Sequence, residues 1–194
     1  RDSTRQLSSD GRFVLFTSDA TNVSPSPIGD PLLNQGNIYV RDTQTGTTKL
    51  VNVSVDGSAY GDAADPSLTP DGRYVVFIGA SYDGSFGISP LVDGITFPSG
   101  ITPGHQLYVR DLVANTTKLV SVRPDGVGSA GNDNDVSFHA SISADGTKVV
   151  FVGGVQDDLV AGDTNGKADI FVRDLVAGTT TLVSHKVAGS NGGN

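Results

Sequence analysis

Residues 7 to 18 read LSSDGRFVLFTS, an Asp-Gly pair followed by a short apolar run, and this pattern decides the fold because it recurs. The chain repeats it as LTPDGRYVVFIG at 68–79 and as ISADGTKVVFVG at 142–153. Glycine enters the left-handed backbone region at least cost, so each Asp-Gly pair predicts a tight turn between two strands. The flanking segments are rich in Val, Phe, Tyr and Ile, as strands require. Each copy is therefore predicted to form a β-hairpin.

A second element follows each copy at a variable distance. It reads NIYVRDTQTGTTKLVNV at 37–53, QLYVRDLVANTTKLVSV at 106–122 and DIFVRDLVAGTTTLVSH at 169–185. Matching turn positions hold Gly46, Asn115 and Gly178, the residue types that adopt a positive φ most readily. The segments after them are β-branched, as strands are. The sequence therefore predicts four strands in each repeat and no helix.

Small four-stranded sheets repeated along a chain are typical of β-propeller blades. We predict an all-β fold of three four-stranded antiparallel blades, at 1–64, 65–135 and 136–194, the last ending in a flexible C-terminal tail. The residues predicted to lie buried between adjacent blades are Phe16, Phe77 and Phe151. Propellers close with about four to eight blades, so three blades are expected to form part of a larger propeller or assembly. Because the chain begins with Arg and contains no Met, we also expect it to derive from a longer polypeptide.

The two repeated motifs resemble the TolB-type, WD-like β-propeller repeats. In that family an Asp-Gly pair and an apolar run ending in Phe are followed by a strand ending Val-x-Asp. The segments LSSDGRFVLF, LTPDGRYVVF and ISADGTKVVF match the first part, and IYVRD, LYVRD and IFVRD match the second. The resemblance implies a propeller fold over nearly the whole chain. It implies little about function, because propellers carry many unrelated activities.

The charge and composition of the chain exclude several classes of partner. Thirteen Lys and Arg against 21 Asp and Glu leave a net charge of −8, which disfavours binding to nucleic acid or to an anionic membrane. No apolar run is long enough for a transmembrane helix. The absence of Cys excludes disulfides and Cys-ligated metals, and it fits a protein of the periplasm, the cell surface or the extracellular medium. The expected partners are other proteins or further copies of this chain, in an oligomer or a fibre.

The clearest candidate for a binding site is the segment DLVAGDTNGKADIFVRDL at 158–175, which contains the later part of a calcium-binding loop, D-x-N-G-x-x-D. The predicted calcium ligands are the side chains of Asp163, Asn165 and Asp169, the carbonyl of Lys167, and a carboxylate from Asp157 or Asp158. Oxygen ligands without His or Cys favour calcium over zinc. The equivalent loops at 20–37 and 81–106 lack the motif, and Asp, Asn and Gly are also ordinary turn residues. A simple polar loop is therefore the open alternative.

No catalytic residue and no organic cofactor site is predicted. Arg-Asp pairs recur at 41–42, 110–111 and 173–174, whereas an active site occurs once, so each Arg is expected to bond within or between blades and each Asp to cap its turn. The three His residues fall in different repeats, and no G-x-S-x-G motif supplies a serine nucleophile.

Two classes of function remain open. The first is a non-catalytic, exported or cell-surface propeller that acts as a structural or binding scaffold, with calcium as its candidate cofactor. The second is the propeller domain of an extracellular hydrolase or lyase, with catalytic residues outside this chain or in the long loop at 81–106. The family resemblance adds a third, a TolB-like component of periplasmic transport. The sequence favours the first over an enzyme.

Overall fold

A computed structural model describes residues 5–20, 22–24, 36–58, 63–80, 91–94, 105–126, 139–153, 159–161, 163 and 166–184. These residues form strands and turns without any helix, which confirms the all-β prediction. The described part of the chain therefore holds no helix of the length and apolarity that crossing a membrane would require. Most of the loop at 81–106 and the predicted tail lie outside the described residues.

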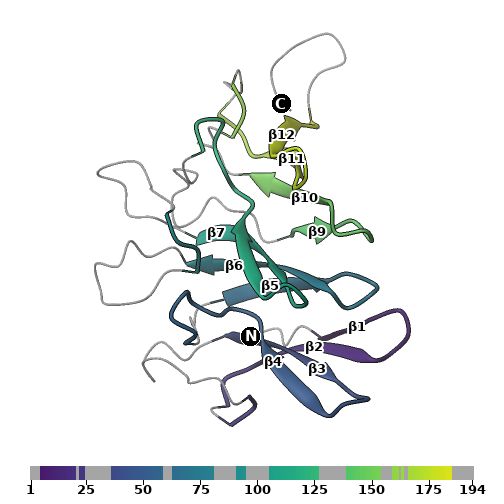
Figure 1. Cartoon of the computed structure of the whole chain (residues 1–194). Helices are drawn as coiled ribbons and strands as arrows, with labels where there is room; N and C mark the ends of the chain where they lie inside the picture. Colours follow the sequence, from purple (N-terminus) through teal and green to yellow (C-terminus); the bar gives the residue numbers. More distant parts are fainter. Residues whose placement is uncertain are drawn as a thin grey trace.

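The strands form three four-stranded antiparallel sheets, which we call blades 1, 2 and 3 (Figure 1). Blade 1 contains β1 (Arg5–Leu7), β2 (Phe13–Ser18), β3 (Asn37–Asp42) and β4 (Thr47–Leu50). Blade 2 contains β5 (Ala63–Leu68), β6 (Tyr74–Ala80), β7 (His105–Asp111) and β8 (Thr116–Leu119). Blade 3 contains β9 (Ser141–Ile142), β10 (Lys148–Gly153), β11 (Asp169–Asp174) and β12 (Thr179–Leu182). Strand order follows the chain in every sheet, so each blade is a simple meander.

The register between the second and third strands is the same in all three blades. The second strand of each blade pairs with the third so that its first residue lies opposite the Asp of the Arg-Asp motif. The pairs are Phe13 with Asp42, Tyr74 with Asp111, and Lys148 with Asp174. The repeat seen in the sequence is therefore a structural repeat, and residues at matching positions can be compared directly.

The Asp-Gly turns have the predicted backbone conformation. Gly11, Gly72 and Gly146 have φ angles of +72°, +75° and +71°. In blade 1 the N–H of Gly11 donates to the carbonyl of Ser8 at 3.0 Å, and the Asp10 carboxylate accepts the Ser8 hydroxyl at 2.6 Å. The left-handed positions predicted in the second hairpin are also confirmed, at Gly46, Asn115 and Gly178.

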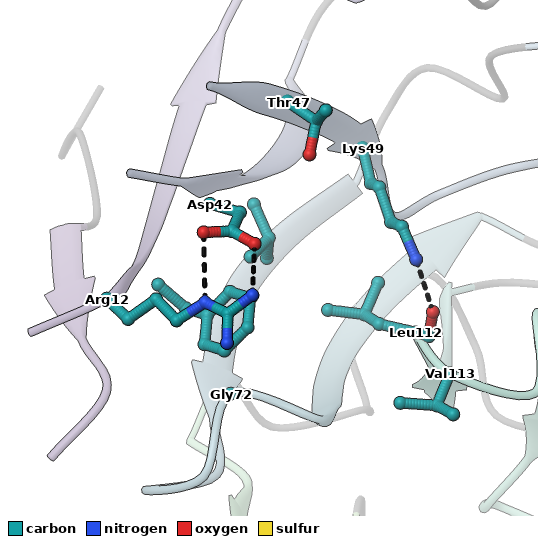
Figure 2. Close-up of a pocket in the computed structure, with 9 residues that line it drawn as sticks. Arg12, Asp42, Thr47, Lys49, Gly72, Leu112 and Val113 are labelled. Atoms are coloured by element: carbon teal, nitrogen blue, oxygen red, sulfur yellow. Dashed lines mark hydrogen bonds and ion pairs between the residues drawn. The ribbon is translucent and has the colours of Figure 1, made fainter. Parts of the chain in front are cut away.

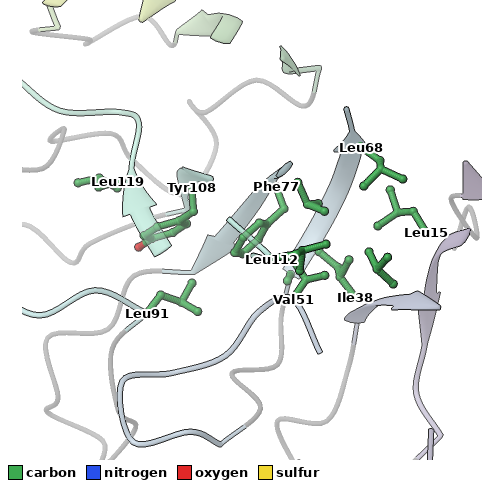
Figure 3. Close-up of a cluster of buried hydrophobic side chains, with 12 residues drawn as sticks. Leu15, Ile38, Val51, Leu68, Phe77, Leu91, Tyr108, Leu112 and Leu119 are labelled. Atoms are coloured by element: carbon green, nitrogen blue, oxygen red, sulfur yellow. The ribbon is translucent and has the colours of Figure 1, made fainter. Parts of the chain in front are cut away.

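Apolar clusters join each blade to the next. One lies between blades 1 and 2 (Figure 3) and includes Leu15, Ile38, Val51, Leu68, Val75 and Phe77. The other lies between blades 2 and 3 and includes Val76, Leu107, Val120, Ile142, Val149 and Phe151. Each fully buried side chain of this size stabilises the fold by about 1.5–3 kcal/mol, so stacking of the blades supplies most of the core.

The burial predicted for the three equivalent Phe residues holds for two of them. Phe77 and Phe151 are 0% and 2% exposed, because each faces the preceding blade. Phe16 is only half-buried, because it lies on the side of blade 1 that no other described sheet covers. Each of the three stacks on the aromatic residue opposite it, at centroid separations of 5.6–5.9 Å.

A second contact between blades joins an aromatic ring to a turn glycine. A Cβ atom on Gly72 would lie 2.2 Å from the ring of Phe13 in blade 1, and one on Gly146 would lie 2.3 Å from the ring of Tyr74 in blade 2. No described atom lies within 4 Å of the equivalent position on Gly11. The glycine of the Asp-Gly turn thus has two roles in blades 2 and 3, a positive φ and room for the aromatic ring of the blade before.

These two roles can be separated by substitution. Gly11→Ala places Cβ in a left-handed residue and is expected to cost about 1–2 kcal/mol. Gly72→Ala has the same backbone cost and also forces Cβ into the Phe13 ring, so it should cost about 1–3 kcal/mol more. Urea unfolding of both variants measures the difference. Equal destabilisation would contradict the proposed packing of Phe13 on Gly72.

Candidate functional site

The predicted calcium loop lies between β10 and β11, and the structure describes part of it. Asp163 is half-buried, Lys167 is exposed, and Asp169, the first residue of β11, is 1% exposed. The other predicted ligands, Asn165, Asp157 and Asp158, lie outside the described residues. The positive φ of Gly166, +63°, provides the bend that a calcium loop needs at this glycine.

The side chain of Asp169 belongs to a hydrogen-bonded arrangement that recurs in every blade. Its Oδ1 accepts the Ser184 hydroxyl at 2.5 Å, and the Ser184 oxygen accepts the N–H of Ile170 at 2.9 Å. The same contacts join Gln106, Ser121 and Leu107 in blade 2, and Asn37, Asn52 and Ile38 in blade 1. We call this arrangement the strand lock, because it ties the start of the third strand to the segment after the fourth.

The strand lock explains the burial of Asp169 but not its charge. In blades 1 and 2 a neutral amide, Asn37 or Gln106, provides the accepting oxygen, so the fold needs only an uncharged acceptor at this position. Blade 3 therefore differs from blades 1 and 2 at this position by an acidic group where the other two have an amide.

Within the described residues, no group of three or more His, Asp or Glu side chains is arranged to hold a metal ion. Asp163 and Asp169 offer hard oxygen ligands of the type that calcium prefers. Calcium binding remains a prediction that depends on these two residues and the Lys167 carbonyl, together with Asn165 and either Asp157 or Asp158, which lie outside the described part.

The Arg-Asp pairs have the structural role predicted for them. Each Arg donates to a Thr hydroxyl on the neighbouring fourth strand, at 3.0–3.1 Å. The pairs are Arg41 with Thr48, Arg110 with Thr117, and Arg173 with Thr180. Each Asp caps the following turn by accepting two backbone N–H groups, as Asp111 does from Val113 and Ala114 at 2.8 and 2.9 Å. None of these six residues is arranged as a catalytic pair.

Each of these Asp residues also pairs with a cation from the first hairpin of its own blade. The ion pairs are Arg12 with Asp42, Arg73 with Asp111, and Lys148 with Asp174. Burial raises the pKa of Asp111, but the hydrogen bonds from Arg73 and from the backbone outweigh burial and lower the pKa to about 2. Hydrogen bonding by Lys148 likewise lowers the pKa of Asp174 to about 2. These carboxylates are charged at neutral pH and are poorly suited to proton transfer.

The ion pairs border two pockets that lie at equivalent places between blades. The pocket between blades 1 and 2, of about 210 Å³, is lined by Arg12, Asp42, Thr47, Lys49, Gly72 and Val113, among others (Figure 2). The Lys49 side chain extends across this pocket, and its Nζ donates to the carbonyl of Leu112 at 2.7 Å. The pocket between blades 2 and 3, of about 280 Å³, has Asp111, Thr116, Lys118, Gly146 and Val176 at the matching positions.

The repetition of these pockets shows that they arise from blade packing. The Asp of each pocket is already bound by an Arg, and an arrangement that occurs at both interfaces does not mark a single catalytic site. Sequence reasoning missed both the pockets and the aromatic–glycine contact beside them. The sequence did contain a signal for the aromatic–glycine contact. Arg-Phe and Arg-Tyr follow the Asp-Gly pairs at 10–11 and 71–72, whereas Thr147-Lys148 follows the pair at 145–146.

No protein family model and no curated protein matches this sequence. Among solved structures, the β-propeller domain of the Trilobed protease from Pyrococcus furiosus aligns with 93% of this chain and 42% of its own, at 11% identity and a TM-score of 0.54. The dipeptidyl peptidase 4 of Porphyromonas gingivalis aligns over 93% of this chain and 25% of its own, at 12% identity and a TM-score of 0.50. TolB from Acinetobacter baumannii has 17% identity over 92% of this chain and 42% of its own, but its TM-score of 0.32 is too low to carry an argument.

The chain therefore spans less than half of the length of each of these three proteins. At such low identities, the similarity shows the fold alone, and that fold is an array of β-propeller blades. Membership of the TolB-type repeat family stays a prediction.

The Arg73–Asp111 pair predicts a defined pH dependence of stability. The folded pKa of about 2 lies below the ordinary value of an unfolded Asp, about 3.9, so the contribution of Asp111 is complete above about pH 4 and is lost as the pH falls toward 2. The free-energy difference between the wild type and Asp111→Asn should thus reach its full value by about pH 5, stay at that value at higher pH, and shrink in acid. Urea unfolding at several pH values measures it. A difference that stays constant with pH would contradict this role for Asp111.

Proposed function

We propose that this chain is a non-catalytic scaffold of propeller blades, exported from the cell or displayed on its surface. It would bind other proteins or further copies of itself, and calcium would stabilise its third blade. One observation carries this proposal: the polar residues that recur in each blade make structural contacts. The Arg-Asp motif, the strand locks and the ion pairs hold hairpins together in each blade.

A second candidate is the propeller domain of an extracellular peptidase. The structures with TM-scores of 0.50 or more that are described above come from proteins named as a protease and a peptidase, and this chain aligns with only part of each. Under this alternative, the blades would form a platform beside a catalytic domain. The lyase and transport alternatives have no comparable support, because their structural matches have TM-scores below 0.5.

The purified chain tests one form of the second candidate, in which the loop at 81–106 carries the catalytic residues, because a catalytic domain outside the chain would leave the chain itself inactive. A scaffold has no turnover, so the chain is expected to leave fluorogenic peptide substrates intact, with or without calcium. Fractions from size-exclusion chromatography would be assayed alongside a known peptidase as a positive control. Peptide cleavage that co-elutes with the chain would overturn the non-catalytic proposal.

Calcium stabilisation is tested by a substitution that retains the strand lock. Calcium at about one hundred times its dissociation constant should stabilise the native state by about 2.7 kcal/mol, so a chelator should lower the melting temperature. Asp169→Asn keeps an accepting oxygen, as Asn37 does in blade 1, but removes the charge. This variant should lose the response to calcium, while Asp93→Asn, an exposed residue elsewhere, should keep it.

Two results would contradict the calcium proposal. One is a wild-type melting temperature that is the same in calcium and in chelator. The other is an Asp169→Asn variant that responds to calcium as strongly as the wild type does.

A further inference from the structure

The two pockets between blades have equivalent linings but differ in one polar contact. In the pocket between blades 1 and 2, Lys49 Nζ donates to the carbonyl of Leu112 at 2.7 Å (Figure 2). In the pocket between blades 2 and 3, Lys118 and Leu175 occupy the equivalent positions. Within the described part of the chain, neither Lys118 Nζ nor the Leu175 carbonyl has a hydrogen-bond or ion-pair partner. The second pocket thus presents a donor and an acceptor that the first pocket pairs with each other.

Two further hydrogen-bonded links occur at the interface between blades 1 and 2. The side chain of Gln6 exchanges hydrogen bonds of 2.8 and 3.0 Å with the backbone of Leu68, and the N–H of Ser9 donates to the Pro70 carbonyl at 2.7 Å. The equivalent positions in blade 2 hold Ser67, whose side chain makes no hydrogen bond within the described residues, and Pro70, which has no N–H to donate. The interface between blades 2 and 3 is therefore held mainly by its apolar cluster.

Lys118 carries the uncompensated charge of the pocket between blades 2 and 3. The other charged side chain among its lining residues is Asp111, which forms an ion pair with Arg73 at 2.8 Å. The pocket therefore has a local positive charge, although the whole chain has a net charge of −8. A carboxylate is the complementary group, because an ammonium and a carboxylate form a charge-assisted hydrogen bond.

Most of the remaining lining of this pocket is apolar. Tyr74, Val109 and Ala114 come from blade 2, and Leu175 and Val176 come from blade 3. Val176 is 80% exposed, so the lining reaches the molecular surface. The volume of about 280 Å³ lies close to the lower limit of about 300 Å³ for ligand pockets. A cavity of this size suits one apolar residue of a ligand whose remainder continues into solvent.

We propose that the pocket between blades 2 and 3 binds the C-terminal residue of a partner peptide that ends in an apolar side chain. The terminal carboxylate accepts from Lys118 Nζ, the N–H of the same residue donates to the Leu175 carbonyl, and the side chain packs on the Tyr74 ring. This inference deepens the proposed scaffold function, and it rests on that function for the idea that the chain binds other proteins.

A chain terminus is the part of a peptide that offers all three groups on one residue. The equivalent donor and acceptor in the other pocket, Lys49 Nζ and the Leu112 carbonyl, are 2.7 Å apart, so the ligand groups that replace this contact must also lie close together. The carboxylate, the N–H and the side chain of a C-terminal residue all join the same Cα atom. An internal Asp or Glu provides a carboxylate only by giving up the apolar side chain.

A nuclear magnetic resonance titration tests the proposal. An acetylated Gly-Gly-Ser-Leu peptide with a free carboxylate is added to the isotope-labelled chain, up to about 5 mM. The backbone signals of Thr116 and Val176 should shift until they saturate, whereas that of Thr47, the equivalent of Thr116 in the other pocket, should not. Amidation of the peptide removes its charge and should weaken binding about tenfold to a hundredfold.

The two equivalent lysines provide matched variants. Lys118→Met removes the ammonium and should weaken binding of the free acid by the same factor as amidation does, whereas Lys49→Met should bind the peptide as the wild type does. Melting temperatures should show the opposite pattern. Lys49→Met loses the bond to Leu112 and should melt lower, and Lys118→Met should melt as the wild type does.

The two exposed valines provide a second matched pair. Val176→Asp places a negative charge at the rim of the proposed site and should weaken binding, whereas Val113→Asp, at the equivalent rim of the other pocket, should not. The wild-type side chains are 80% and 74% exposed, so circular dichroism should show that both variants remain folded.

Four results would overturn the proposal. They are an absence of shifts at Thr116 and Val176 up to about 5 mM peptide, equal binding of the free and amidated peptides, unchanged binding by Lys118→Met, and equal binding of an amidated peptide with an internal Asp. Cleavage of the peptide during the titration would refute the non-catalytic scaffold and leave the pocket assignment intact. An intact peptide that does not bind would refute the pocket assignment alone.

Discussion

The packing of each sheet against the next is the interaction on which the rest of this structure depends. A four-stranded sheet of short strands is too small to be stable alone, and stacking is what buries its apolar faces. The central sheet shows this most clearly, since four consecutive residues of β6, Val75 to Ile78, are all 0% exposed. A continuous apolar run of this kind is typical of a strand buried on both faces. In β10, which has one covered face, exposure instead alternates along the strand.

In blades 1 and 2, ion pairs at the edges of the sheets support this stack. In blades 1 and 2 the Arg after the Asp-Gly turn lies over the aromatic ring beside it, at 4.8 and 4.7 Å, and also binds the Asp that caps the second turn. One guanidinium therefore fixes both hairpin turns and the ring that contacts the next blade. Because this arrangement serves packing, the most conspicuous polar motif in the sequence does not indicate where a ligand binds.

Blade 3 departs from residues that blades 1 and 2 share. Thr147 and Lys148 replace the Arg-aromatic pair, Thr181 replaces a lysine that bridges blades, and Asp169 replaces a neutral amide. Lys148 and Thr181 occupy the positions from which Phe13 and Lys49 reach the next blade, whereas Thr147 lines the pocket beside blade 2 and Asp169 is an acidic residue at the start of β11. The features that the packing of this chain does not require thus concentrate in its third sheet.

The sequence alone determined the strands, the turns and the repeat, because those depend on local properties: apolar runs with β-branched residues, and glycines such as Gly46 that adopt a positive φ. It also placed Asp169 in a candidate calcium loop. Only the tertiary structure decided which faces are covered. Phe16 and Phe77 occupy the same repeat position, yet one is half-buried and the other fully buried, because burial depends on whether a neighbouring sheet is present. The strand lock likewise joins residues 14 or 15 positions apart, a pairing that the strand register creates.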